Sequence, residues 1–139
     1  MGFTYATIQL LNTGDIEVAR RGYIPKGEIR RMEVTALVDS GAIDLCINET
    51  IKQQLGLTVL ETHSVKLADG TERLLEIAGP VDVRFLNRST TVRAIVLPGD
   101  NEVLLGAIPL EGMDVIIDPL DQQLKLPPDR PYLARSVVK

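Results

Sequence analysis

Apolar and polar residues alternate along much of this chain, in short runs separated by glycine, proline, asparagine and aspartate. The clearest run extends from Met32 to Val38, where residues at every second position share one face, as the two-residue period of a β-strand requires. β-Branched residues recur in the runs, and turn-forming residues recur between them, which is typical of strands joined by turns. The pattern predicts an all-β barrel.

The alternation predicts a series of strands and the turns between them. We expect strands over residues 3–11, 16–20, 32–38, 59–67, 73–77, 81–85, 91–97, 103–105, 115–117 and 124–126. Turns are expected at residues 12–15, 68–71, 86–89 and 98–101. Asp-Gly in the second of these turns is a strong signal for a β-hairpin.

Two short helices are expected within this β-rich pattern. Asn48 can cap a helix that continues through Gln54, and Gly56 can end it in the left-handed conformation. A second helix is expected at residues 109–113, because proline suits a first helical turn and glycine suits an end. The prolines after residue 126 predict a C-terminal tail, about residues 127–139, that leaves the body of a single domain.

Composition limits the classes of function. The chain has 139 residues, of which 45% are hydrophobic and 24% charged, as expected for one compact domain. Its net charge is -4 and its basic residues are scattered, so it lacks the basic stripe that nucleic-acid binding needs. A single cysteine, Cys46, excludes an internal disulfide, and together with the single histidine, His63, it leaves too few soft ligands for a structural zinc site.

No apolar run reaches the length of a membrane span, and the N-terminus lacks the features of a signal peptide. We therefore expect a cytoplasmic protein with no membrane or nucleic-acid partner, no metal and no cofactor.

The candidate chemistry lies at the end of the clearest strand, in the sequence Leu37-Val38-Asp39-Ser40-Gly41-Ala42. There a carboxylate follows an apolar strand and precedes a hydroxyl and a glycine that accepts tight backbone geometry. These parts suit a catalytic turn, although Asp-Ser-Gly is also a common surface turn. A hairpin with an Asp-Gly tip and the sequence Leu104-Leu105-Gly106 follow later in the chain.

Taken in this order, the three features resemble the retropepsin-like aspartic proteases, single-domain relatives of pepsin that include the retroviral proteases. The catalytic motif of that family matches residues 37–42, its flap matches roughly residues 65–77, and its apolar-apolar-Gly signature matches residues 104–106. The resemblance covers about residues 5–126. The chain departs from the family where Ser40 replaces the commoner threonine, and where Ala107-Ile108 follow the signature in place of arginine and then asparagine or aspartate.

The resemblance implies an aspartic endopeptidase in which two aspartates share one proton and activate a water molecule. This chain has one Asp-Ser-Gly and is too short for two lobes, so the implied enzyme is a symmetric homodimer that cuts an extended or unfolded polypeptide. The implied catalytic residues are Asp39, Ser40 and Gly41, and the implied substrate-binding residues are Ala42, Ala68, Asp69, Gly70 and Thr71.

The neighbours of the aspartate have implied roles of their own. The Ser40 hydroxyl is expected to hydrogen-bond across the dimer axis, and the Gly41 N–H to donate to a carboxylate. Pepsin-like lobes often carry serine or threonine at the position of Ala42, and that hydroxyl would lower the carboxyl pKa. We therefore expect activity from weakly acidic to near-neutral pH.

Three other interpretations stay open. The chain could be a retropepsin-like module that dimerises or binds peptides without cutting them, because 4% aromatic residues and no tryptophan leave few large groups for a flap or pockets. It could be a small β-barrel with an unrelated ligand, if the Asp39 motif is coincidental. Asp114 and Asp118 flank an apolar strand and offer a less favoured intrachain partner for Asp39.

A core role for Cys46 is favoured over a nucleophilic one, because only one histidine is present.

Overall fold

The computed structural model describes residues 3–66 and 68–132. Its strands are β1 (Thr4–Asn12), β2 (Arg31–Val38), β3 (Leu45–Asn48), β4 (Thr58–Lys66), β5 (Glu72–Phe85), β6 (Arg88–Leu97), β7 (Val103–Leu105), β8 (Ile116–Asp118) and β9 (Gln123–Lys125). The helices are α1 (Thr13–Arg20), the 3-10 helix η1 (Lys26–Glu28), α2 (Glu49–Leu55) and α3 (Ala107–Met113). Within the described residues, no helix is long and apolar enough to cross a membrane.

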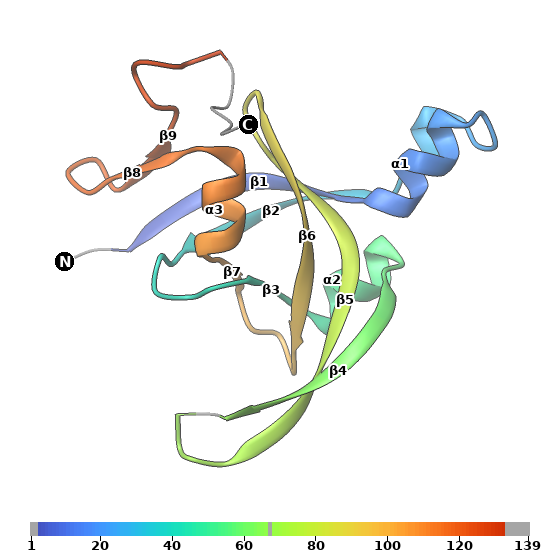
Figure 1. Ribbon diagram of the computed structural model, residues 1–139, viewed down its shortest axis with the longest axis horizontal. Coiled ribbons are helices and arrows are strands. Elements are labelled where there is room, and N and C mark those ends of the chain that lie inside the picture. Colours follow the sequence, from blue (N-terminus) through green and yellow to red (C-terminus); the bar gives the residue numbers. More distant parts are fainter. Residues whose placement is uncertain (1–2, 67, 133–139) are drawn as a thin grey trace, which may run out of the picture.

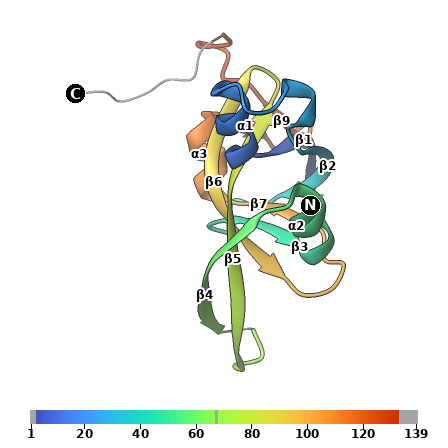
Figure 2. The same cartoon turned by 90° about the vertical axis from the view of Figure 1, so that its right-hand side faces the viewer.

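Six strands pair in a ring and close into a barrel, and Figures 1 and 2 show how these strands are arranged in space. The order around the barrel is β1-β2-β7-β3-β6-β5, and the pairing of β1 with β5 closes it. Strand β4 pairs with β5 outside the ring and forms a long hairpin with it, while β8 and β9 form a separate small sheet. The all-β barrel that the alternating pattern predicts is confirmed.

The barrel interior is filled by the inward-facing residues of alternating strands. Burial alternates along β1 and β2 with the period of two that the sequence shows. Large apolar side chains with 1% exposure or less occupy the centre, among them Ile8, Leu10, Leu45, Ile47, Leu55, Leu105 and Met113. Burial of apolar surface is the main favourable contribution to folding, at about 25 cal/mol per Å².

The segment after β1 is a helix, so the predicted turn at residues 12–15 and the predicted strand at residues 16–20 are wrong. The Asn12 side chain accepts a hydrogen bond from the Asp15 N–H at 3.0 Å and caps α1. The first turn holds Asp15 and the last turn holds Arg20, an arrangement that suits the helix dipole. The residues that suggested a turn form the start of a capped helix.

Strand β5 joins two segments that the sequence pattern separates. The predicted strands 73–77 and 81–85 are two halves of one 14-residue strand. Its pairing with β6 shifts register between Ala78 and Val81, and this irregularity accommodates Gly79-Pro80 without ending the strand. The hairpin that follows is confirmed, with its turn at Leu86 and Asn87.

The other predicted elements agree with the structure. Asn48 caps α2 by accepting from the Ile51 N–H at 2.9 Å, and Gly56 ends it with φ 62°. Helix α3 and strands β7, β8 and β9 lie within a few residues of their expected positions. Leu67, the last residue of the predicted strand 59–67, lies outside the described residues.

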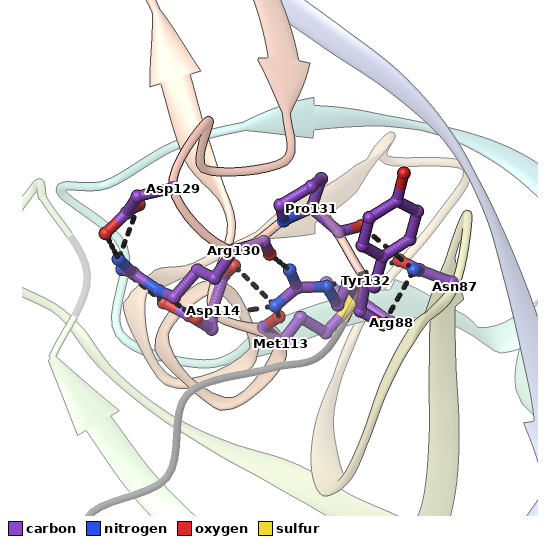
Figure 3. Close-up of polar contacts among 8 residues, drawn as sticks. All are labelled: Asn87, Arg88, Met113, Asp114, Asp129, Arg130, Pro131 and Tyr132. Carbon is purple, nitrogen blue, oxygen red and sulfur yellow. Dashed lines mark hydrogen bonds and ion pairs between the residues drawn. The ribbon is translucent and has the colours of Figure 1, made fainter.

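A buried arginine ties the end of the chain to the barrel (Figure 3). Arg88 is 2% exposed, and its Nη1 donates to the Asp114 carbonyl oxygen at 3.2 Å and lies 3.4 Å from the Asp114 carboxylate. The same carboxylate accepts two bonds from the Arg130 guanidinium, at 2.6 and 2.9 Å. The Asp114 carboxylate therefore joins a barrel strand to the C-terminal segment.

The C-terminal segment stays on the barrel up to Tyr132. Asn87 Nδ2 in the β5–β6 turn donates to the carbonyl oxygens of Pro131 and Tyr132, at 3.1 and 3.0 Å. Pro131 and Tyr132 therefore contact the barrel, although the sequence predicts that the tail begins at about residue 127. Residues 133–139 of the predicted tail lie outside the described residues.

Candidate active site

Asp39 follows the last residue of β2 and is held by backbone hydrogen bonds. Strands β2 and β7 are parallel neighbours, and the Asp39 N–H donates to the Leu105 carbonyl oxygen at 3.0 Å. The Ala42 N–H donates to the Asp39 carbonyl oxygen at 3.0 Å and closes the turn. The Gly41 N–H donates to Asp39 Oδ1 at 3.0 Å, so the expected donation to a carboxylate occurs within one chain. Ser40 and Gly41 are exposed.

The segment after β7 holds the other side of the Asp39 turn. The N–H groups of Ala107 and Ile108 donate to the carbonyl oxygens of Ala42 and Ile43, both at 2.8 Å. Gly106 lies against this turn so closely that a Cβ atom there would be 2.4 Å from the Asp44 carbonyl oxygen. The motifs at residues 37–42 and 104–106 are therefore in direct contact, and glycine is needed for their close approach.

Cys46 on β3 is buried beside the same turn. Burial is the main cause that raises the pKa of its thiol to about 11, and the negative charges of Asp44 and Asp39 add to the effect. A thiol with that pKa stays protonated near neutral pH and is a poor nucleophile. The core role that the sequence favours for Cys46 agrees with its burial.

The predicted flap is the β4–β5 hairpin, which projects from the barrel as a long arm (Figures 1 and 2). Asp69 Oδ1 accepts from the Thr71 hydroxyl at 2.6 Å and from the Thr71 N–H at 2.9 Å, and these bonds hold the pKa of the Asp69 carboxyl below its ordinary value. Gly70 has φ 89°, which favours glycine. Together with Ala68, these residues form an exposed tip.

The structure does not join the two groups of predicted site residues. Among the described residues, no hydrogen bond links the tip, residues 68–71, to the Asp39 turn. In Figure 1 the arm extends past the barrel on the side where the β2–β3 connection lies. Residues 39–42 therefore form one cluster at the barrel, and residues 68–71 form another at the end of the arm.

A cavity of about 180 Å³ lies between the base of the arm and the barrel. Its walls are mostly apolar, and it is lined by Asp44, His63, Val65, Leu75, Ile77, Arg93, Ala94 and Ile95. Glu61 accepts from Arg93 at 3.0 Å and lies 2.6 Å from His63, so charged groups border the cavity. The sequence motifs do not single out these residues, although the alternation along residues 63–65 and 75–77 shows which hairpin side chains share a face.

The two candidate intrachain partners of Asp39 are engaged elsewhere. Asp114 binds Arg88 and Arg130, as described above. Asp118 Oδ2 accepts from Lys125 at 3.0 Å, which is the main cause that lowers the pKa of the Asp118 carboxyl. Over residues 3–66 and 68–132, no group of three or more His, Cys, Asp or Glu residues could hold a metal ion.

Comparisons with known proteins agree with this architecture. A family model described as gag-polyprotein putative aspartyl protease matches residues 26–112. The retroviral protease-like domain of Ddi1 from Leishmania major has 19% identity, covers 88% of both chains and has a TM-score of 0.53. A retropepsin-like aspartic protease from Rickettsia conorii has 16% identity, covers 85% of this chain and 89% of its own, and has a TM-score of 0.45. No curated protein matches the chain. The Leishmania structure supports the fold of this chain.

Proposed function

The chain belongs to the family of gag-polyprotein putative aspartyl proteases, which are retropepsin-like aspartic proteases, and from this premise we propose that it is an aspartic endopeptidase that acts as a homodimer. The observation that supports this most directly is the hydrogen bonding of the two carboxylate oxygens of Asp39. Its Oδ1 accepts the Gly41 N–H, whereas Oδ2 accepts no hydrogen bond from any described residue. One carboxylate oxygen is thus fixed by the backbone, and the other is available for a proton or a water molecule.

The reaction needs a second carboxylate a few ångströms from the first. Two such groups share one proton, because two like charges so close cannot both ionise. The ionised group takes a proton from a water molecule that attacks the peptide carbonyl, and the protonated group stabilises the oxygen on which charge develops. Since Asp114 and Asp118 bind other residues, we assign the second carboxylate to Asp39 of another copy.

The surface beside the Asp39 turn is suited to contact a second copy of the chain. Ile43 is 66% exposed and Ile108 is 47% exposed, and the hydrogen bond from the Ile108 N–H to the Ile43 carbonyl keeps the two residues adjacent. Exposed apolar side chains that adjoin one another favour a protein interface. A twofold axis beside this pair would bury both side chains and bring the two Asp39 turns together.

The substrate in this proposal is an extended polypeptide lying between the Asp39 turn and the β4–β5 hairpin, with the tip residues 68–71 closing over it. Extended peptides bind beside strands through main-chain hydrogen bonds, and pockets select alternate side chains. The cavity of about 180 Å³ with walls from Val65, Leu75 and Ile77 would take an aliphatic side chain of the substrate. We expect cleavage next to such residues, at weakly acidic to near-neutral pH.

Replacement of Asp39 by Asn tests the proposal. Asp39→Asn should abolish cleavage of an unfolded protein substrate and leave the dimer assembled, because the amide has the shape of the carboxyl but cannot act as base. Asp100→Asn, in the exposed turn after β6, is the matched control and should keep full activity. Cleavage by Asp39→Asn at the wild-type rate would rule out the mechanism.

A peptide-binding module without catalysis is the second candidate. The observation that favours it is the low aromatic content, 4% with no tryptophan, which leaves few large groups to close over a substrate. A statine-type mimic of the transition state separates the two functions. The protease should bind it far more tightly than a peptide of the same sequence, whereas a binding module should not distinguish the two.

A further inference from the structure

A second and larger cavity lies away from the Asp39 turn, where the segment between β1 and β2 folds back on the barrel. Its volume is about 450 Å³, and it is lined by Leu11, Ile16, Ala19, Arg20, Lys26, Ile29, Arg31 and Arg84. Figures 1 and 2 both show α1, which forms one wall, at the opposite end of the molecule from the hairpin tip. The volume falls in the range of small-molecule sites, about 300–1,000 Å³.

Helix α1 has an apolar face that the protein itself covers only in part. The helix has eight residues and none of them is buried. Ile16 and Ala19 are half-buried and face the cavity, and Ile29 lines it from the segment beyond η1. Helices in proteins gain most of their stability from packing of an apolar face. An apolar ligand in the cavity would supply the contacts that α1 lacks.

The charged groups around this apolar floor all have one sign. Of the residues that the structure describes, four cations and no acidic residue line the cavity, although the net charge of the chain is -4. Arg20 is paired with Glu17 at 3.0 Å, and Arg84 lies 3.9 Å from Asp82. For the other two cations, Lys26 and Arg31, the described part of the chain provides no ion pair.

The guanidinium of Arg31, one of the two unpaired cations, contacts the backbone of Lys26, the other. Arg31 Nη2 donates to the Lys26 carbonyl oxygen at 3.4 Å, which brings the guanidinium beside η1. A guanidinium fork matches the geometry of a carboxylate or phosphate, and an ammonium group adds a point charge. An anionic group placed here would neutralise charges that the protein leaves without partners.

We propose that this cavity binds a single-chain amphiphile with an anionic head, carboxylate or phosphate. The apolar chain lies against Leu11, Ile16 and Ile29, and the head lies between Lys26 and Arg31. The combination of an apolar floor with a purely basic rim supports this ligand over a neutral or cationic one. The inference does not rest on the protease activity, so Asp39→Asn should bind the amphiphile as the wild type does.

Binding of dodecanoate and of dodecyl phosphate to the full chain tests the inference, by calorimetry and by the shift in melting temperature, below the micellar concentration. We expect saturable binding of at least one of them and a raised melting temperature. Binding of dodecanoate or of dodecyl phosphate supports the site, and the compound that binds identifies the head group of the ligand. Dodecyltrimethylammonium, which has the same chain and the opposite charge, and acetate, which lacks the chain, should not bind.

Variants locate the ligand. Lys26→Glu combined with Arg31→Glu should weaken binding by about tenfold or more, because two attractive charges become repulsive. Arg21→Glu, at the end of α1 and outside the cavity lining, is the matched control and should change affinity less than about twofold. Ala19→Trp should fill the cavity and abolish binding, while Val18→Trp, on the exposed side of α1, should not.

Three results of the binding experiments would overturn the inference, and one result of hydrogen exchange would also do so. The three binding results are no saturable binding of either anion, equal binding of dodecyltrimethylammonium, and unchanged binding by a folded Ala19→Trp variant. The amide hydrogens of Ile16 and Ile29 could also be protected from exchange only at protein concentrations at which oligomers form. That result would contradict the inference, since a second copy of the chain would then occupy the cavity.

Discussion

Gly106→Ala is the substitution that probes most sharply how the Asp39 turn is held. The added methyl carbon would lie 2.4 Å from the Asp44 carbonyl oxygen, 2.8 Å from the Ile43 carbonyl carbon and 2.9 Å from the Ala42 carbonyl oxygen. Contacts under 3.0 Å are essentially never seen for a Cβ atom, and all three neighbours are backbone. The turn and the backbone at residue 106 must therefore move apart by at least about 0.6 Å, since no side chain can rotate away.

The expected loss in the free energy of unfolding follows from the contacts that this movement disrupts. Overpacking of a tight site costs about 1–3 kcal/mol. The hydrogen bonds from Ala107 and Ile108 to the turn, both 2.8 Å long, would lengthen, and each contributes about 1 kcal/mol. We expect the free energy of unfolding to fall by about 3 kcal/mol and the melting temperature by about 10 °C, for a domain of this size. Displacement of Asp39 by half an ångström or more should also lower kcat by about tenfold or more.

Calorimetry and cleavage of an unfolded substrate measure the two effects. Gly27→Ala is the matched control, because a Cβ atom there would meet nothing within 4 Å and its φ is not positive. We expect that variant to stay within about 0.5 kcal/mol of the wild type. A Gly106→Ala protein with wild-type melting temperature and activity would refute the role we assign to the contact between the two motifs.

Three further predictions concern charge and burial. The pKa of Asp15 is held below its ordinary value of 3.8, first by the side-chain hydrogen bond to Arg30, so its stabilisation is complete above that value and is lost as pH falls through the lower folded value. Asp15→Asn should thus cost about 1 kcal/mol at pH 7, allowing for the exposure of Arg30, and this cost should decrease as the pH is lowered from 3.8 through the folded pKa, as measured by urea unfolding. Cys46, with its pKa raised to about 11, should resist thiol reagents at pH 7.5 until the protein unfolds, and Cys46→Ala should remain active. Asp114→Asn should cost about 3 kcal/mol, because it leaves the buried guanidinium of Arg88 without its counter-charge.

Controls and contrary results are available for each of the three. Asp100→Asn is the control for Asp15→Asn, and an Asp15→Asn effect that does not decrease at any pH below 3.8 would contradict the linkage. Rapid labelling of Cys46 in the native protein would show that the thiol is accessible and ionised. A loss below 1 kcal/mol for Asp114→Asn would mean that the C-terminal contacts of Figure 3 do not compensate the buried charge.

The sequence predicts those parts of the fold that depend on local pattern. The alternation before Asp39, the cap at Asn48 and the left-handed stop at Gly56 each act within a few residues, and each is present in the structure. The prediction for residues 12–20 is wrong because the local pattern there is compatible with two structures. Asn12 serves a turn and a helix cap equally well, and the choice is set by distant contacts such as its side-chain donation to the Leu55 carbonyl oxygen at 2.8 Å.

Other features depend on contacts that no local pattern contains. Gly79-Pro80 suggests a break, yet the pairing of β5 with β6 continues on both sides of it, while β4 pairs with the half of β5 before Pro80 and β1 pairs with the half after it. The burial of Arg88 and the attachment of Arg130 to Asp114 join residues far apart in sequence, so the docked C-terminal segment is not visible in composition. For the site, the sequence predicts the Asp39 motif and its order relative to Gly106. The cavity beside Asp44 cannot be predicted in this way, because it forms only when the β4–β5 hairpin packs beside the barrel.

The pairing of two Asp39 carboxylates in one active site is tested most directly by mixing wild-type and Asp39→Asn chains. The chains are refolded together at constant total concentration, and cleavage is measured as the wild-type fraction is varied. If each site needs Asp39 from both copies, activity follows the square of that fraction and is about a quarter of the full value at equal amounts. A linear dependence, with about half the activity at equal amounts, would show that one chain is sufficient and would contradict the shared site.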